Sequence, residues 1–349
     1  MNKTLVIITP GFPVNEADTC CIPPQQVFVK ALKENNPLLN IIVVTFQYPF
    51  LSKRYLWHGI QVISLGGKNK GNIFRIFLWL KAWQVLKQLK NENQLVGLLS
   101  FWLGECAFIG KWFAQKNNIK HYCWLLGQDA KAGNRYFTLI KPNAEKLVAI
   151  SDFVATQLYN NYAVHPQHII PVGVDRSMFE RIENERNIDV LAAGSLIILK
   201  QYHLFIHVIA ELKKTFPNIR TVLCGDGPEL EKIQQLITTL DLNKNIVLKG
   251  EIPHTEVLHL MQHSKLFLHT SLYEGFSTVC AEALYAGAWV ISFCKPMKEN
   301  FNKWLIAESQ EEMIQQSIPI LKEHPFNNNK VLTYTIENST EKILELFMN

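Results

Sequence analysis

Glu274 and Glu282 stand eight residues apart in a stretch whose residue types suit a phosphorylated ligand. Between them, Gly275 lets backbone approach a ligand closely, and Ser277 or Thr278 can cap a helix. The free amides of that helix's first turn would face an anion such as a phosphate. Glu282 lies four residues past Thr278, hence on the same helix face and about 6 Å further along.

This spacing suggests the chemistry of a sugar nucleotide. A carboxylate set back one helical turn from a phosphate site can accept hydrogen bonds from a ribose diol. Glu274, on the loop itself, is placed to hold a sugar hydroxyl. Alternatively, Glu282 is a solvated helix residue and Glu274 an ordinary loop acid. The connecting Gly-Phe-Ser-Thr sequence favours the binding interpretation, because each piece has a role in one geometry.

Positioning these residues requires a strand, a loop, a helix and a second strand. Apolar runs at 265–269 and 288–293 predict the two strands, and the helix is expected to end near residue 286. Similar alternation along the whole chain predicts an α/β fold. Further strands are expected at residues 5–8, 41–46, 61–65, 96–101, 121–126, 147–150, 188–193, 220–224 and 245–249.

The length of the chain predicts two domains. At 349 residues it exceeds what one core usually fills, so two domains of roughly 170 residues are expected. A charged, Asn-rich stretch at 176–187 is typical of a linker. We therefore predict an N-terminal domain at 1–180, a C-terminal domain at 181–335, and a closing helix at 336–349.

Two further motifs in the second half can meet phosphate charge. Lys200 follows Gly194 by six residues, at the expected entry of a helix, where a cation would neutralise a diphosphate leaving group. Gly225 and Gly227 follow a predicted strand, but Leu230 occupies the position of the third glycine of a dinucleotide fingerprint. A nicotinamide enzyme is therefore disfavoured.

These motifs together resemble the retaining GT-B glycosyltransferases, specifically glycosyltransferase family 4. The Glu-x7-Glu pair, the Gly225-Asp226-Gly227-Pro228 turn and the Ile170 to Asp175 segment carry the resemblance, which covers about 300 residues loosely. It implies two Rossmann-like, doubly wound domains that face each other across a cleft. It also implies that the N-terminal domain binds the acceptor and the C-terminal domain binds a nucleotide-diphosphate sugar.

The resemblance implies the site residues. Glu274, Lys200 and Asp129, the last in Leu126-Gly127-Gln128-Asp129, are the predicted catalytic residues. Glu282 is expected on the donor ribose, and backbone at 250–252 beside the nucleobase. The predicted donor-binding residues are Gly11, Gly194, Ser195, Lys200, Gly225, Gly227, Gly250, Ile252, Glu274, Gly275, Phe276, Ser277, Thr278 and Glu282.

Several positions depart from the family's pattern. Leu126 stands where a histidine is common, and Ser195 replaces an arginine that, with Lys200, would contact the diphosphate. Gln201 stands where a glycine usually follows that lysine. Gly11 is alone where the family has a small or Gly-Gly loop. Half of the expected positive charge at the diphosphate is therefore absent.

The predicted function is transfer of a hexose-like sugar from a UDP- or GDP-sugar to an acceptor hydroxyl with retention, in surface polysaccharide or glycolipid synthesis. One alternative is a GT-B epimerase or phosphorylase. Another is a degenerate nucleotide-binding protein without turnover, suggested by Ser195 and Leu126. No Asp-x-Asp occurs in the chain, so no metal and no other cofactor is expected, and neither His203 with His207 nor His259 with His263 has a third ligand in sight.

Charge and cysteine content bear on partners and compartment. Residues 1–150 hold 18 Lys and Arg against 7 Asp and Glu, a net charge of +11, which suggests an anionic membrane surface, a phosphate-bearing acceptor, or solubility alone. No nucleic acid partner is expected. Seven cysteines without a Cys-x-x-Cys pair favour a reducing cytoplasm, and the apolar N-terminal run is expected to be a strand rather than a signal peptide.

A tryptophan-bearing segment leaves two interpretations open. If helical, residues 73–89 place Lys81, Gln84 and Lys87 on one side and an apolar surface with Phe74, Trp79 and Trp83 on the other. A basic helix of this kind can lie on a membrane, but an apolar stripe is more often core. The basic loop at 53–70 is the better membrane candidate, so peripheral attachment to the inner face of the membrane is an expectation.

Overall fold

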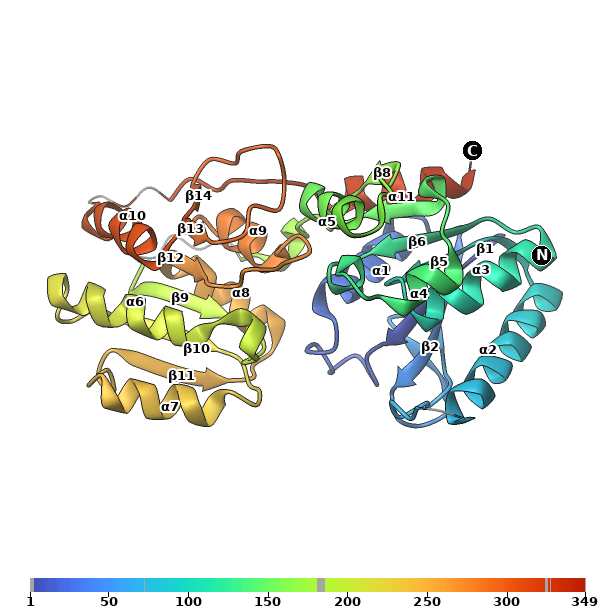
Figure 1. Ribbon diagram of the computed structural model, residues 1–349, viewed down its shortest axis with the longest axis horizontal. Coiled ribbons are helices and arrows are strands. Elements are labelled where there is room, and N and C mark those ends of the chain that lie inside the picture. The colour runs from blue at the N-terminus through green and yellow to red at the C-terminus, as the bar shows by residue number, and fades with distance from the viewer. Residues whose placement is uncertain (1–2, 72, 181–185, 324–325, 327, 349) are drawn as a thin grey trace. The chain divides into compact units, whose positions relative to one another are not determined.

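The chain folds into two compact units, shown in a computed structural model (Figure 1). The structure describes residues 3–71, 73–180, 186–323, 326 and 328–348. Unit 1 is formed by Met1–Gly173 and Ile336–Asn349, and unit 2 by Val174–Thr335. The observed boundary between Gly173 and Val174 lies a few residues before the boundary expected after residue 180. Residues 181–185 of the expected linker fall outside the described residues.

Unit 1 is built on an eight-stranded sheet of order β3-β4-β2-β1-β5-β6-β7-β8. All neighbouring strands are parallel except β3 and β4. Buried runs of Val, Ile and Leu in β1 and β2 are typical of a parallel sheet covered on both faces. The strands are β1 Lys3–Gly11, β2 Asn40–Tyr48, β3 Lys53–Trp57, β4 Ile60–Ser64, β5 Gln94–Phe101, β6 His121–Leu125, β7 Leu147–Ala149 and β8 His168–Ile169.

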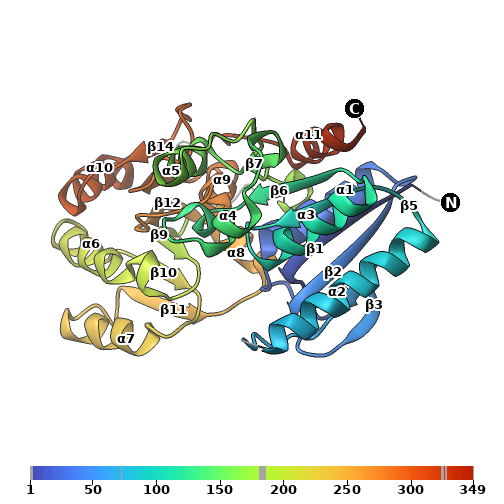
Figure 2. The same ribbon diagram turned by 45° about the vertical axis from the view of Figure 1, so that its right-hand side comes forward.

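Helices of unit 1 cover the two faces of this sheet. They are α1 Pro23–Asn35, α2 Ile73–Glu92, α3 Glu105–Asn117, α4 Arg135–Ile140, α5 Asp152–Tyr162 and α11 Ile336–Met348. The buried side chains of α2 and α3 form one core with β1, β2 and β5, and the two helices lie side by side in Figure 2. α11 packs against α1 and β5, where Gly97 leaves the space that the ring of Phe347 fills.

Unit 2 contains a six-stranded parallel sheet of order β11-β10-β9-β12-β13-β14. Numbered from one within this unit, the order is 3-2-1-4-5-6, that of the Rossmann fold. The strands are β9 Ile188–Ala193, β10 Thr221–Cys224, β11 Ile246–Gly250, β12 Ser264–His269, β13 Trp289–Ser292 and β14 Trp304–Ile306.

Alternate residues of these strands face two separate cores. Val190 and Ala192 of β9 pack under one set of helices, whereas Leu191 and Ala193 pack under the other. The first set is α6 Tyr202–Thr215, α7 Leu230–Thr239 and α10 Gln310–Lys322, and the second is α8 His254–Gln262 and α9 Thr278–Tyr285. Both faces of the sheet are therefore covered, and its edges and the ends of its strands are left to meet solvent or ligand.

Three elements lie where the sequence predicted none. The segment expected to be a basic loop contains β3, which pairs antiparallel with β4. β14 and α10 occupy the polar region after residue 293 for which no elements were predicted. α3 begins at Glu105, after Trp102 with a left-handed φ of 60° and Gly104 with an extended backbone. Within the described residues, no helix is both long and apolar enough to cross a bilayer.

Candidate functional site

The site residues of unit 2 gather where its strand order reverses, between β9 and β12. The loop after β9 and the loop after β12 both leave the carboxyl edge of the sheet, the edge where open α/β sheets bind ligands. Two hydrogen bonds join these loops: Thr270 Oγ1 donates to the carbonyl of Lys200 over 2.7 Å, and Ser271 Oγ to that of Leu199 over 3.2 Å. The two loops therefore form one surface.

Glu274 is the centre of the charge on this surface. Its carboxylate accepts a hydrogen bond from Nζ of Lys200 and lies 3.4 Å from Nε2 of His269, the last residue of β12. The Lys200 and Glu274 side chains are 18% and 16% exposed, so this ion pair is largely removed from water. Sequence reasoning named Lys200 and Glu274 separately but missed their contact, and it missed His269 because that residue ends an apolar strand.

The protonation states around Glu274 are unequal. Burial alone would raise the pKa of Glu274, but His269 and Lys200 outweigh burial and lower it to about 2. Burial and the nearby Lys200 lower the pKa of His269, despite the carboxylate beside it. At neutral pH, Glu274 is therefore an anion and a hydrogen-bond acceptor.

The helix that follows this loop begins under backbone strain. Ser277 precedes α9 with a left-handed φ of 58°, which few residues other than glycine and asparagine adopt. Its hydroxyl contacts Sγ of Cys280 over 3.0 Å and does not cap the helix, so the predicted cap by Ser277 or Thr278 is wrong. The first-turn amides of α9 are therefore not capped by a side-chain hydroxyl. The buried ring of Phe276 fixes the loop that precedes the helix.

Glu282 lies one turn into α9 and is nearly buried. Its Oε1 lies 2.9 Å from Nε2 of His254, the first residue of α8. Burial lowers the pKa of His254, but the charge of Glu282 and its hydrogen bond outweigh burial and leave this pKa raised. The two residues are 28 positions apart in the chain, so no local spacing could have indicated this pair.

The predicted phosphate-loop glycines have a backbone role in the structure. A Cβ on Gly225 would lie 1.9 Å from the carbonyl oxygen of Gly194, and one on Gly227 would lie 2.6 Å from that of Leu196. Both glycines have positive φ values, 137° and 155°. They therefore allow the loops after β9 and β10 to touch, whereas a Cβ on Gly250 would meet open space.

Two departures from the family's pattern have structural consequences. Gln201 adopts a left-handed φ of 51° directly before α6, which explains why a glycine suits this position. Among the described residues, its buried Oε1 has no hydrogen-bond partner. Ser195 lies in the loop after β9 and carries no charge, so Lys200 is the cation that this loop brings to Glu274.

In unit 1, the Asp129 side chain binds backbone amides of two loops. Its two carboxylate oxygens accept hydrogen bonds from the amides of Leu103, over 2.8 Å, and Gly127, over 2.9 Å. Burial raises its pKa, although those amides oppose the shift. The strand order of unit 1 reverses between β1 and β5. Gly11 is the last residue of β1, and Leu103 follows the end of β5. This geometry makes Asp129 a positioning residue, and its catalytic role stays a prediction.

The histidine pairs of unit 2 lie on or beside helices and gather no further metal ligands. Across the described part of the chain, no three His, Cys, Asp or Glu side chains come together as a metal site would require. His203 lies on α6 with His207, and His263 follows the end of α8 with its Nδ1 against the carbonyl of His259 at 2.9 Å. His203 and His207 therefore share one helix, whereas His263 directly follows the helix that carries His259.

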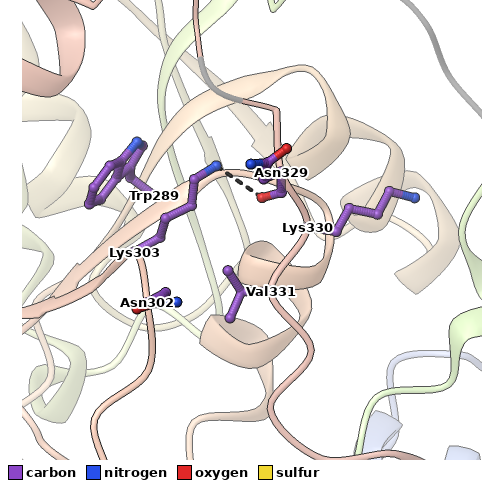
Figure 3. A pocket seen from close by; sticks show the side chains of 6 residues that line it. All are labelled: Trp289, Asn302, Lys303, Asn329, Lys330 and Val331. Atoms are coloured by element: carbon purple, nitrogen blue, oxygen red, sulfur yellow. Dashed lines mark hydrogen bonds between the residues drawn. The ribbon is translucent and has the colours of Figure 1, made fainter.

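A cavity of about 610 Å³ lies where strands β13 and β14 begin, at the end of the unit 2 sheet opposite to the carboxyl edge (Figure 3). Trp289, the first residue of β13, and Lys303, just before β14, line it. Nζ of Lys303 donates to the carbonyls of Gly287 and Asn329, each over 3.0 Å. Lys303 thus links the backbone at Asn329 to that of Gly287, just after the end of α9, which indicates a structural role for this lysine.

Comparison with known proteins finds a family match in the C-terminal part of the chain. Residues 174–341 match the model of the family described as "Glycosyl transferases group 1". A solved glycosyltransferase from Rickettsia africae superposes with a TM-score of 0.74 and 14% identity, over 99% of this chain and 98% of its own. At this identity, the likeness concerns the fold.

Two curated relatives match smaller parts. A phosphatidylinositol N-acetylglucosaminyltransferase of Arabidopsis thaliana is 28% identical over 127 residues, 36% of this chain and 28% of that protein. The GtfA component of a UDP-N-acetylglucosamine–peptide N-acetylglucosaminyltransferase from Streptococcus parasanguinis is 27% identical over 194 residues, 53% of this chain and 36% of its own. The chain thus spans about a third of the length of these relatives.

Proposed function

Because residues 174–341 match the model of the glycosyl transferases group 1 family, we propose that this chain transfers a sugar from a nucleotide-diphosphate donor to an acceptor hydroxyl. The chain has the GT-B fold, an α/β fold with two parallel-sheet domains. The observation that carries the proposal is the contact of Lys200 with Glu274 at the β9–β12 switch point of unit 2, with Glu282 on the helix that follows the same loop.

The donor's parts are matched to distinct groups of this surface. The diphosphate binds at the amino end of α9 and to Lys200, since uncapped amides and an ammonium group both favour an anion. Glu282 accepts hydrogen bonds from the ribose diol with the oxygen that His254 does not hold. Glu274 accepts hydrogen bonds from hydroxyls of the transferred sugar, and the open space beside Gly250 takes the base.

We propose a retaining, metal-independent transfer. Lys200 and the α9 amides stabilise the negative charge that develops on the leaving diphosphate. Glu274 stays ionised because its pKa is about 2, so it also stabilises positive charge that develops on the sugar ring. As the bond between the anomeric carbon and the diphosphate oxygen breaks, the acceptor hydroxyl attacks the anomeric carbon on the same face and gives its proton to the departing diphosphate oxygen.

The donor is proposed to be a UDP- or GDP-hexose, with UDP-N-acetylglucosamine the first to test. Both curated relatives described above are named as N-acetylglucosaminyltransferases, and one name includes that donor. The proposed acceptor is a glycan or a lipid-linked glycan in polysaccharide or glycolipid synthesis. The proposed location is cytoplasmic, with peripheral attachment to an anionic membrane surface that the net charge of +11 over residues 1–150 would favour.

Calorimetric titration and a transfer assay test this function. UDP, GDP and their sugars are titrated into the wild type, Glu282→Ala and Glu256→Ala, the last replacing an exposed glutamate of α8. Loss of the ribose hydrogen bonds should weaken nucleotide binding about 10- to 100-fold in the first variant only. Lys200→Ala should reduce turnover about 100-fold, whereas Lys214→Ala on the exposed face of α6 should not.

The product separates the alternatives. A new glycosidic bond with the donor's anomeric configuration, identified by NMR, supports retaining transfer. An altered free sugar nucleotide would indicate an epimerase, and release of a sugar phosphate a phosphorylase. Nucleotide binding without donor hydrolysis would identify a binding protein, the outcome that the uncharged Ser195 favours. Unchanged binding and turnover in both site variants would contradict the assigned site.

A further inference from the structure

α2 of unit 1 has a second apolar face that none of the described residues of unit 1 covers. Leu78, Ala82, Leu86 and Leu89 form the buried stripe. On the first half of the helix, the residues Ile73, Phe74, Ile76, Phe77 and Leu80 are between 55% and 61% exposed. At 100° per residue, Ile73, Phe77 and Leu80 lie roughly opposite the buried stripe.

A neighbouring loop extends this apolar surface. Leu51, in the loop between β2 and β3, is 64% exposed. The next residue, Ser52, accepts a hydrogen bond over 2.6 Å from Nζ of Lys81 on α2, which places the loop beside the helix. We call the exposed side chains Leu51, Ile73, Phe74, Ile76, Phe77 and Leu80 the α2 surface. Such a concentration of exposed large apolar groups marks an interaction site.

The segment that carries the α2 surface is positively charged, and its Arg75 lies 3.8 Å from the carboxylate of Glu105 on α3. Residues 35–91 contain eight Lys and Arg and no Asp or Glu. Lys68 and Lys70 are exposed just before α2, and Nζ of Lys70 lies 5.0 Å from the centre of the Phe74 ring. The exposed Lys87 lies two turns beyond Leu80 on the same side of the helix. A partner must therefore be apolar at its centre and negatively charged around it.

We propose that the α2 surface docks on an anionic lipid bilayer, with Ile73, Phe77 and Leu80 inserted at the level of the headgroups. Branched and aromatic apolar side chains beside lysines, on a helix that lies parallel to the surface, are the features of interfacial binding. The lack of Asp and Glu in residues 35–91 favours lipid over a protein partner, since protein interfaces commonly contain charges of both signs. Trp79 and Trp83 are half-buried in the core and take no part.

This proposal deepens the membrane association proposed above and is independent of the transfer reaction. It also changes the sequence expectation, in which the apolar surface of 73–89 was core and the basic loop was the membrane candidate. In the structure, the core uses one side of α2, and the other side adds apolar anchors to that loop's charge. Docking by α2 would bring unit 1 to a surface that can hold a lipid-linked acceptor.

Vesicle flotation tests the surface directly. The full chain is mixed with phosphatidylcholine vesicles with or without phosphatidylglycerol, at low and high salt. We expect flotation with the anionic vesicles at low salt and less at high salt. Ile73→Ser, Phe77→Ser and Leu80→Ser combined should lower the partition coefficient at least tenfold, and Lys68→Gln with Lys70→Gln should lower it about fivefold per lysine.

A matched control combines Leu38→Ser and Leu139→Ser, which replace exposed leucines of unit 1 outside the α2 surface. It should float like the wild type, and all variants should keep their melting temperature and their binding of UDP. The proposal is overturned if the wild type binds neither vesicle, or if the control loses as much binding. It is also overturned if light scattering shows a dimer that the triple variant dissociates, because the α2 surface would then join two copies of the chain.

Discussion

Oε1 of Glu282 lies 2.9 Å from Nε2 of His254, so the residue proposed to hold the donor ribose is itself held by a neighbouring helix. Both side chains are almost buried, with 10% and 12% exposed. The contact joins α8 to α9 and leaves the second carboxylate oxygen for a ligand. His254 thereby positions Glu282.

His254→Gln should change how stability depends on pH. Because Glu282 raises the pKa of His254, the imidazolium contributes stability that is fully present below the ordinary pKa of 6.5 and is lost as pH rises through the raised value. Glutamine keeps a donor but cannot take up a proton. Urea denaturation at a series of pH values should show the variant weaker at low pH, with the difference shrinking at high pH. A pH-independent difference would contradict this account.

Glu274→Gln should weaken unit 2 at neutral pH by roughly 1–3 kcal/mol, because Lys200 and His269 lose a buried anion. The folded-state pKa of about 2 lies below the ordinary 4.5, so the stabilisation is present above pH 4.5 and is lost as pH falls toward 2. Thermal unfolding from pH 7 down to pH 2 measures this loss. Glu231→Gln, at an exposed site on α7, should show no such trend, and a gap that persisted at pH 2 would refute the ion-pair explanation.

Gly225→Ala should be among the most destabilising small substitutions in unit 2, costing at least about 3 kcal/mol. Its Cβ would lie 1.9 Å from the Gly194 oxygen at a φ of 137°, so the loops after β9 and β10 must separate. Gly250→Ala is the comparison, since its φ is 68° but its surroundings are open, and about 1 kcal/mol is expected from the left-handed backbone alone. Equal losses in the two variants, measured by chemical denaturation, would show that contact with Gly194 is not the cause.

Lys303→Met should remove a rise in stability at alkaline pH. Burial, and then the nearby charge of Arg186, lower the pKa of Lys303 to about 8, below its ordinary 10.5. Between these values the unfolded chain binds more protons than the folded chain, so the titration of Lys303 makes wild-type stability rise with pH from about 8 to 10.5. Denaturation across that window should show the rise in the wild type and in Lys330→Met, a lysine at the exposed mouth of the same cavity. A rise that persisted in Lys303→Met would assign it to another group.

Local periodicity was sufficient for most of the sheet elements. Apolar runs predicted β9, β12 and β13 to within one or two residues, because strands buried on both faces leave a continuous signal. β3 was not predicted because this edge strand mixes polar and apolar residues, and β14 was not predicted because a strand of three residues is too short to show a period. The sequence also could not separate the buried face of α2 from its exposed face, because both faces are apolar and together resemble one broad core stripe.

Candidate residues were easier to predict than their contacts. Glu274, Glu282 and Lys200 could be selected because their spacing from glycines and helix starts is local. Their partners could not be selected in this way: the Lys200–Glu274 contact joins residues 74 apart, and the His254–Glu282 contact joins residues 28 apart. Asp129 was expected to be a catalytic residue, whereas in the structure both of its carboxylate oxygens accept hydrogen bonds from backbone amides.

The sequence alone determined the α/β class, the strand–loop–helix–strand unit around the two glutamates, and the excess positive charge of the first half, because each depends on neighbours along the chain. Tertiary structure decided the strand order that brings the loops after β9 and β12 together, the ionised state of Glu274, and which side of α2 meets solvent. These depend on burial and on charges supplied by distant segments, and neither quantity exists until the sheets have formed.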